Sequence, residues 1–125
     1  MAPLKILLVD DSPTMRRILS TTLKHLGYED IGQAKNGREA LSKLHTDGYS
    51  FVITDWNMPE MDGLTFVKMM KGESEFSSIP ILMVTTRSQQ EDVLEAMRAG
   101  VNNYIVKPFT PQTLKQKIDA ILGQK

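Results

Sequence analysis

The segment that decides the fold is KILLVDDSP, residues 5–13. Its first half, Lys5–Val9, is a short aliphatic run of the kind that forms a strand buried on both faces of a sheet. Ser12–Pro13 then provides a helix N-cap and a proline at the first helical position. The acidic dipeptide Asp10–Asp11 stands between these two parts. The segment therefore predicts a strand followed by a helix, with two carboxylates at the carboxyl end of the strand.

The alternation of a short aliphatic run with a longer stretch of helical spacing occurs five times along the chain. Such alternation predicts parallel strands joined by right-handed crossovers, with helices on both faces of the sheet. We therefore predict a single doubly wound α/β domain over residues 1–125. The predicted strands are Lys5–Val9, Asp30–Ala34, Phe51–Thr54, Ile79–Val84 and Tyr104–Val106. The helices are expected to begin near Pro13, Asn36, Gly63, Gln90 and Pro111.

Composition excludes several classes of function. The 125 residues include 15 basic and 15 acidic side chains, and this zero net charge argues against binding nucleic acid or anionic lipid through bulk charge. The absence of cysteine excludes disulfides, thiolate zinc sites and a cysteine nucleophile. The aliphatic runs are far shorter than a membrane span, and no signal-type apolar region precedes the first strand. We expect a soluble, cytoplasmic protein.

Chemically reactive side chains follow the predicted strands at their carboxyl ends, where sheets of this kind bind ligands. Asp10 and Asp11 follow the first strand, Asp55 follows the third, Thr85 closes the fourth and Lys107 follows the fifth. Carboxylates that share a pocket raise one another's pKa or bind a cation. Oxygen ligands without a nearby His or Cys favour a hard ion such as Mg²⁺. The pattern predicts a magnesium site formed by the three aspartates.

Each of these residues also has a purely structural explanation. An aspartate after a strand is commonly a helix cap or a solvated loop residue, and most lysines are surface residues. Thr85 is equally suited to bond a neighbouring carbonyl, and Thr86 beside it competes for any role in a site. We favour a site because all of these residues fall at strand ends. In addition, Pro108 restricts the backbone after Lys107 and makes a cis bond available there.

Charge balance indicates which reaction such a site supports. Three carboxylates, one Mg²⁺ and one ammonium sum to zero, so a phosphoryl group can be held between the metal, the ammonium and a hydroxyl. Phosphoryl transfer requires mainly positioning and charge neutralisation, and carboxylates are established nucleophiles toward phosphorus. Asp55 is the best nucleophile candidate because it stands alone at its strand end, whereas Asp10–Asp11 forms a natural metal-binding pair.

Five segments together resemble the receiver domain of bacterial two-component response regulators. They are Leu8–Ser12, Ile53–Pro59, Met61–Gly63, Val84–Thr86 and Val106–Phe109, and they cover essentially the whole chain in the order found in the family. The segments Thr14–Arg17, Asp55–Pro59 and Asn103–Phe109 are similar to the CheY-type chemotaxis regulators within it. The resemblance implies a flavodoxin-like five-stranded sheet with strand order 2-1-3-4-5.

The resemblance also implies roles at the strand ends. Asp55 would accept a phosphoryl group from the phosphohistidine of a histidine kinase of the CheA type. Mg²⁺ would be bound by Asp11, Asp55 and the backbone carbonyl of Asn57, with Asp10 assisting through water. Thr85 would donate a hydrogen bond to one phosphoryl oxygen, and the Lys107 ammonium would pair with another.

A surface for partner proteins is implied as well. In the family, an aromatic side chain at the position of Tyr104 turns inward on phosphorylation and changes the surface formed by the fourth helix, fifth strand and fifth helix. In CheY-type regulators this surface binds the flagellar switch protein FliM, part of it contacts the kinase, and phosphatases are further partners. We expect a monomer that binds no nucleic acid and inserts in no membrane. The residues assigned to this surface are Tyr104, Val106, Phe109 and Lys117.

Two residues depart from the CheY pattern. Arg87 stands two residues after Thr85, where the best-known regulator of this type has a glutamate, and Thr86 is bulkier than the small residue often found there. We expect the added cation to slow or redirect the attack of water on the phosphoryl group, and the bulk of Thr86 to crowd the pocket.

Other functions remain alternatives at this point. The chain could be a phosphorelay intermediate or phosphate sink, which differs from a chemotaxis regulator only in its partners. It could also be a Mg²⁺-dependent aspartyl-phosphate phosphohydrolase of the haloacid dehalogenase type, although Asn57 stands where that class has a second aspartate. A plain flavodoxin-like binding domain is disfavoured, because no Gly/Ser/Thr-rich phosphate loop follows the first strand.

Overall fold

The computed structural model describes residues 4–123, which form a five-stranded parallel sheet and five helices. The strands are β1 (Lys5–Val9), β2 (Asp30–Ala34), β3 (Phe51–Thr54), β4 (Ile81–Thr85) and β5 (Asn103–Val106). The helices are α1 (Pro13–His25), α2 (Gly37–Thr46), α3 (Gly63–Gly72), α4 (Gln90–Ala99) and α5 (Pro111–Leu122). The order across the sheet is β2-β1-β3-β4-β5, which confirms the expected doubly wound α/β fold. The outermost residues of the predicted domain, 1–3 and 124–125, lie outside the described part.

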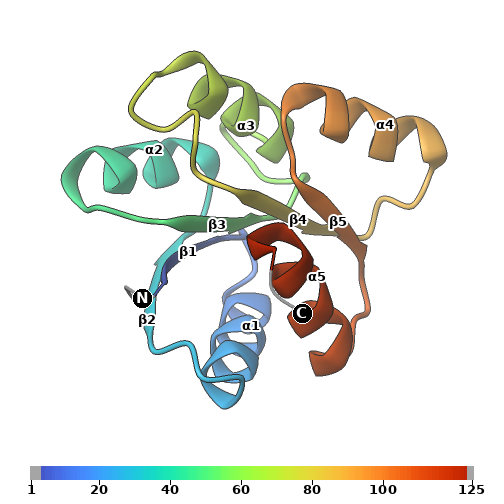
Figure 1. Cartoon of the computed structure of the whole chain (residues 1–125). Coiled ribbons are helices and arrows are strands. Elements are labelled where there is room, and N and C mark those ends of the chain that lie inside the picture. The colour runs from blue at the N-terminus through green and yellow to red at the C-terminus, as the bar shows by residue number, and fades with distance from the viewer. Residues whose placement is uncertain (1–3, 124–125) are drawn as a thin grey trace.

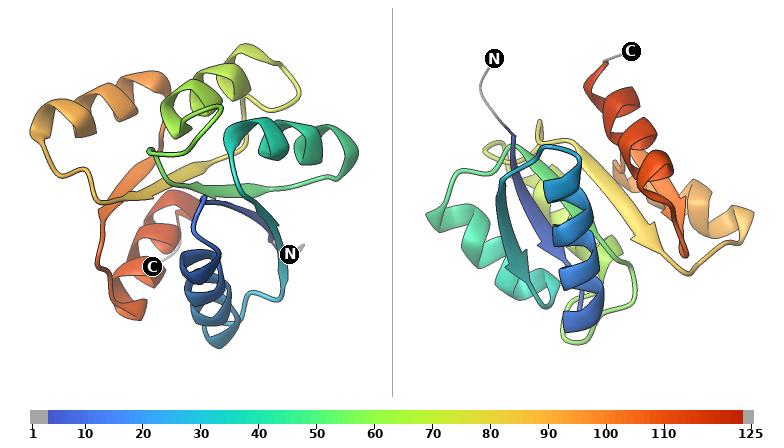
Figure 2. Two further views of the ribbon diagram at one scale, coloured as in Figure 1. Left: turned by 180° about the vertical axis from the view of Figure 1, so that it is seen from behind. Right: turned by 90° about the horizontal axis from the view of Figure 1, so that it is seen from below.

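The helices cover both faces of the sheet. Helices α2, α3 and α4 lie on one face and α1 and α5 on the other, and the views from behind and from below agree (Figures 1 and 2). Because successive strand residues point to opposite faces, Leu7 and Val9 of β1 join the core under α2–α4, whereas Ile6 and Leu8 join the core under α1 and α5. The aliphatic run of β1 is therefore explained by burial on both of its faces.

Most of the helices begin at a side-chain cap. Ser12, Asn36, Asp62 and Thr110 each accept a hydrogen bond from the backbone N–H three residues later, at 2.8–3.1 Å. A cap of this kind contributes about 1 kcal/mol to stability, because it satisfies a backbone donor that has no partner within the helix. Helix α4 differs, since its cap residue Gln89 makes no such bond.

The boundaries of two strands differ from the prediction. The fourth strand begins at Ile81 rather than Ile79, and it includes Thr85. Pro80 has no N–H to give to the sheet, and Ile79 donates instead to Phe76 in the preceding turn at 3.1 Å. The fifth strand begins one residue earlier than predicted, at Asn103.

The strand order fixes where a site forms. The chain leaves β1 toward β2 on one side and later returns to β3 on the other side, so a crevice lies beyond the ends of β1 and β3. Val9 pairs with Thr54 in the register of these strands, and the Asp55 N–H donates to the Val9 carbonyl at 2.9 Å. The residues that follow the two strands are therefore neighbours.

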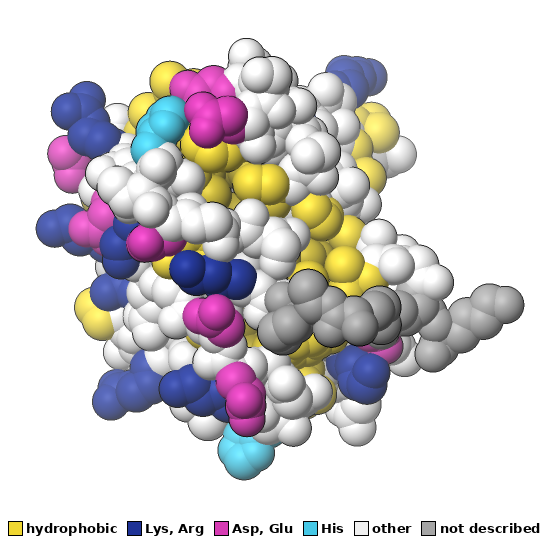
Figure 3. Space-filling view, turned by 60° about the vertical axis from the view of Figure 1, so that its left-hand side comes forward, with side chains coloured by type: hydrophobic (Ala, Val, Ile, Leu, Met, Phe, Trp, Pro, Cys, Tyr) yellow, Lys and Arg dark blue, Asp and Glu magenta, His cyan; other side chains and the backbone are white. Residues whose placement is uncertain are grey.

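The surface shown in Figure 3 carries interspersed basic and acidic side chains on the side of α2, with no large patch of one sign. Within residues 4–123, none of the helices combines the length and the apolar character that crossing a bilayer requires.

Helix α3 begins against the backbone that follows β3. The Gly63 N–H donates to the Trp56 carbonyl at 2.7 Å, and a Cβ added to Gly63 would lie only 1.9 Å from the Asp55 carbonyl oxygen. Only glycine permits this close approach of two backbone segments. The start of α3 thus holds the segment after Asp55 in place.

Replacing Gly63 with alanine should lower the free energy of unfolding by about 2–3 kcal/mol, because backbone must move to admit the methyl group. Urea denaturation measures this loss. Gly72→Ala, at the other end of the same helix, is the matched control, since a Cβ there meets nothing within 4 Å. We expect its stability to be unchanged or about 0.5 kcal/mol higher. Equal losses in the two variants would show that the close approach at Gly63 is unimportant.

Candidate functional site

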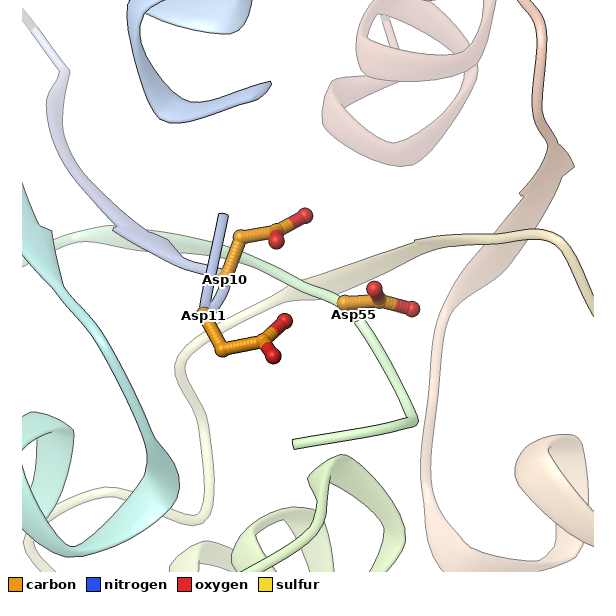
Figure 4. Close-up of side chains that lie close together, drawn as sticks. All are labelled: Asp10, Asp11 and Asp55. Atoms are coloured by element: carbon orange, nitrogen blue, oxygen red, sulfur yellow. The ribbon is translucent and has the colours of Figure 1, made fainter. Parts of the chain in front are cut away.

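The structure brings the three predicted aspartates together. Each offers a carboxylate oxygen, and these oxygens lie within 4.8 Å of one another. Asp10 and Asp11 project from the chain after β1 and Asp55 projects from the chain after β3, all toward the same side (Figure 4). Asp10 is 2% exposed and Asp55 is 9% exposed, whereas Asp11 is open to solvent. Two buried carboxylates and one accessible carboxylate therefore form one acidic cluster.

Backbone donors orient the two buried carboxylates. Oδ1 of Asp10 accepts from the Ser12 N–H at 2.9 Å, and Oδ1 of Asp55 accepts from the Trp56 N–H at 2.6 Å. The backbone carbonyl of Asp10 also accepts from the Arg16 guanidinium on α1. Hydrogen bonds of this kind fix the rotation of each carboxylate and compensate part of the cost of burying its charge.

Lys107 joins the two buried carboxylates from the end of β5. Its Nζ lies 2.9 Å from Oδ2 of Asp10 and 3.1 Å from Oδ2 of Asp55, and its peptide bond to Pro108 is cis. Burial lowers the pKa of the Lys107 ammonium, but the hydrogen bond to Asp10 and the charges of Asp55 and Asp10 outweigh this, so its pKa lies above the ordinary value of 10.5. The ammonium is charged at neutral pH and offsets one of the three negative charges.

The donor set of this cluster fits a hard divalent cation. It offers only carboxylate oxygens, the whole chain has no cysteine, and the ammonium leaves two negative charges to be offset. Asp11 is accessible and close to both buried carboxylates. Asn57 is exposed two residues after Asp55, and its side-chain oxygen accepts from Nε of Arg87 at 3.0 Å.

The two threonines at the end of β4 differ in their surroundings. Thr85 is fully buried and Thr86 is exposed, as the alternation of side chains along a strand requires. Oγ1 of Thr85 accepts from the Arg87 N–H at 3.4 Å, and its carbonyl accepts from the Lys107 N–H at 2.8 Å. Thr85 is thus hydrogen-bonded both to the loop that follows β4, at Arg87, and to the residue that follows β5, Lys107.

Tyr104 points inward. Its side chain is 8% exposed and its hydroxyl donates to the Arg87 carbonyl at 2.9 Å. Burial, with a contribution from the charge of Asp92, raises the pKa of Tyr104 to about 12, so the phenol keeps the proton that it donates.

The other residues of the predicted partner surface differ in exposure. Val106 is 40% exposed, whereas Phe109 is half-buried and packs against the core under α1 and α5. Lys117 is half-buried, with its Nζ 3.4 Å from Oδ1 of Asn103. Two exposed residues of α4, Leu94 and Met97, were not part of that prediction.

The contacts of Arg87 were also missed by the sequence analysis, which considered only its charge. The guanidinium carbon lies 4.4 Å from the centre of the Trp56 ring, and Nη1 lies 3.4 Å from Oδ1 of Asp92. One signal in the sequence could have predicted the ion pair: Asp92 lies in the first turn of the helix that begins three residues after Arg87.

The sequence is similar to that of known proteins over nearly its whole length. Its residues 6–119 match the family described as response regulator receiver domain. It is 55% identical to the chemotaxis protein CheY1 of Helicobacter pylori over 96% of this chain and 98% of that protein. It is 51% identical to a CheY homologue of Campylobacter jejuni over 96% of this chain and 93% of that protein.

Solved structures agree with these sequence matches. Chemotaxis protein CheY4 of Vibrio cholerae has a TM-score of 0.89 at 39% identity, covering 96% of this chain and 99% of that chain. The receiver domain of the sensor histidine kinase PA1611 from Pseudomonas aeruginosa, described with a magnesium ion in its active-site cleft, has a TM-score of 0.87 at 26% identity, covering 98% of this chain and all of that chain. The chain therefore belongs to the response regulator receiver domain family and is a CheY-like member of it.

Proposed function

We propose that Asp55 accepts a phosphoryl group from the phosphohistidine of a histidine kinase of the CheA type. A carboxylate oxygen of Asp55 bonds to phosphorus, the P–N bond breaks, and the imidazole nitrogen keeps the electron pair and takes a proton from solvent. The observation that carries this proposal is the acidic cluster with Lys107 3.1 Å from Asp55, at the strand ends of a receiver fold. The chain is then a signalling protein that promotes only its own phosphorylation and dephosphorylation.

Mg²⁺ is the proposed cofactor. Asp11, Asp55 and the backbone carbonyl of Asn57 would bind it, with Asp10 assisting through water. When bound, the ion offsets negative charge on the phosphoryl oxygens. The support is the oxygen-only cluster and the magnesium ion described for the Pseudomonas receiver domain.

The remaining site residues are proposed to hold the phosphoryl group. The Lys107 ammonium pairs with one of its oxygens, and the Thr85 hydroxyl donates to another. Both residues lie at strand ends beside Asp55, and the Lys107 N–H bonds the Thr85 carbonyl, so their positions are coupled. Because Tyr104 bonds the backbone two residues after Thr85, movement of this segment would reach β5.

The proposed partner is a flagellar switch protein of the FliM type, and the proposed process is chemotaxis in the cytoplasm. The relatives in Helicobacter and Campylobacter are named chemotaxis proteins. The proposed docking surface combines the exposed apolar side chains of Leu94, Met97 and Val106 with Lys117, whose Nζ lies 3.4 Å from Oδ1 of Asn103 in β5. Tyr104, buried in β5, and the half-buried Phe109 would contribute to it, and a kinase would share part of this surface. We propose that the chain acts as a monomer.

Removing one charge from the acidic cluster should stabilise the metal-free protein and weaken its response to Mg²⁺. In EDTA, we expect Asp11→Asn to raise the free energy of unfolding by about 1 kcal/mol, the repulsion between unit charges about 4 Å apart in water. Millimolar Mg²⁺ should raise the melting temperature of the wild type and have little effect on the variant. Asp30→Asn, exposed at the opposite end of the sheet, is the control and should respond to Mg²⁺ as the wild type does. An unchanged Mg²⁺ response in Asp11→Asn would contradict the ligand assignment.

Acetyl phosphate with Mg²⁺ should add one alkali-labile phosphoryl group per chain, measured by intact-protein mass spectrometry. Asp55→Asn should add none, because an amide oxygen cannot form the acyl phosphate, and Asp30→Asn should behave as the wild type. Continuous release of phosphate from a small phosphoester, with no phosphorylated protein, would instead support the phosphohydrolase alternative.

A peptide from the N-terminus of FliM should bind at least fivefold more tightly when beryllofluoride, a phosphoryl mimic, is present with Mg²⁺. Met97→Ala should weaken that binding three- to tenfold, about 1 kcal/mol, as expected for a contributing apolar contact. Met69→Ala on α3 is the matched control, because the two methionines are 42% and 43% exposed. Fluorescence anisotropy of a labelled peptide gives both affinities. Absence of the gain with beryllofluoride, or equal effects of the two methionines, would argue for a phosphorelay intermediate or phosphate sink.

A further inference from the structure

Arg87 connects two segments that flank the proposed phosphoacceptor. Its Nε donates to the Asn57 side chain at 3.0 Å and its guanidinium stacks over the Trp56 ring at 4.4 Å. These are the two residues directly after Asp55. On its other side, Nη1 pairs with the Asp92 carboxylate in the first turn of α4 at 3.4 Å. The guanidinium of Arg87 therefore contacts both the segment that follows Asp55 and the first turn of α4.

The backbone of Arg87 is held at both of its polar groups. Its N–H bonds Oγ1 of Thr85 and its carbonyl accepts from the Tyr104 hydroxyl. The side chain is 37% exposed, and its contacts are all with other side chains rather than with backbone. The guanidinium can therefore change partners by rotation of its side chain without displacing the strand end.

The first turn of α4 lacks the restraint found at the other helices. Its cap residue Gln89 makes no side-chain hydrogen bond, whereas α1, α2, α3 and α5 each have a side-chain cap. The first helical bond runs from the Val93 N–H to the Gln89 carbonyl at 3.1 Å. The ion pair of Asp92 with Arg87 is therefore a side-chain link from this turn to the sheet edge.

We propose that Arg87 is a switched cation, for which Asp92 and a phosphoryl group on Asp55 compete. The inference rests on the proposed function, because it requires the phosphoryl group to form at Asp55. A partly exposed ion pair at 3.4 Å is weak, whereas a guanidinium binds phosphoryl oxygens through short charge-assisted bonds. The phosphorylated state thus draws Arg87 away from Asp92, and the first turn of α4 loses its link to the sheet edge.

Competition requires a reciprocal effect. If the phosphoryl group removes Arg87 from Asp92, then removal of the Asp92 charge must strengthen binding of the phosphoryl group by the same factor. Leu94 and Met97 lie on the same helix, so loosening of this turn reaches the docking surface. Arg87 in this role acts as a positioning residue rather than as a reacting group.

The test titrates beryllofluoride with excess Mg²⁺ and follows the fluorescence of Trp56, the single tryptophan of the chain. Asp92→Asn should lower the apparent Kd about threefold, the size expected for a partly exposed ion pair. Glu95→Gln, which removes the same charge from an exposed position of α4, should change it by much less. In an Arg87→Gln background, Asp92→Asn should have no further effect.

Amide hydrogen exchange with and without beryllofluoride supplies a second readout, because a merely structural ion pair would not respond to beryllofluoride. Beryllofluoride should accelerate exchange of the Val93 amide in the wild type, and Arg87→Gln should show the faster exchange already without it. A normal response to beryllofluoride with equal Kd in wild type and Asp92→Asn overturns this inference and leaves the phosphoacceptor proposal standing. An effect of Asp92→Asn that persists without Arg87 also overturns it. Absence of any beryllofluoride response in the wild type overturns both.

Discussion

Like charge at one edge of the sheet is the constraint on which the rest of this structure depends. Three carboxylates offer oxygens within 4.8 Å, and two of these side chains are almost completely buried. Burying carboxylate groups is costly unless backbone donors and cations compensate them. The Lys107 ammonium lies between Asp10 and Asp55 and supplies part of that compensation. The remaining negative charge is the feature on which the proposed Mg²⁺ site depends, and its self-repulsion lowers the stability of the metal-free protein.

The fold could be predicted because its strands are buried on both faces. The run Lys5–Val9 has no polar residue after its first position, so a strand with both faces covered by helices buries all of its apolar side chains. The predicted boundaries of two strands were wrong. Ile79 looks like part of the strand Ile81–Thr85, but Pro80 between them cannot donate to the sheet, and the chain forms a turn there instead.

The site could be predicted to the extent that strand ends determine it. The sequence placed Asp10, Asp55 and Lys107 at the ends of three strands, and the parallel sheet brings those ends together. The partners of Arg87 could not be predicted, because they depend on which way a long side chain turns from its loop. Phe109 was assigned to a partner surface by resemblance, and in the structure it packs largely against the core under α1 and α5.

The contacts of Lys107 join distant parts of the chain, since 97 residues separate it from Asp10 and 52 from Asp55. During synthesis on a ribosome, both aspartates emerge long before this lysine. A nascent chain that ends before β5 has the acidic residues but lacks the ammonium that lies between them. Newly made protein therefore acquires its complete set of site charges only when the last strand has joined the sheet.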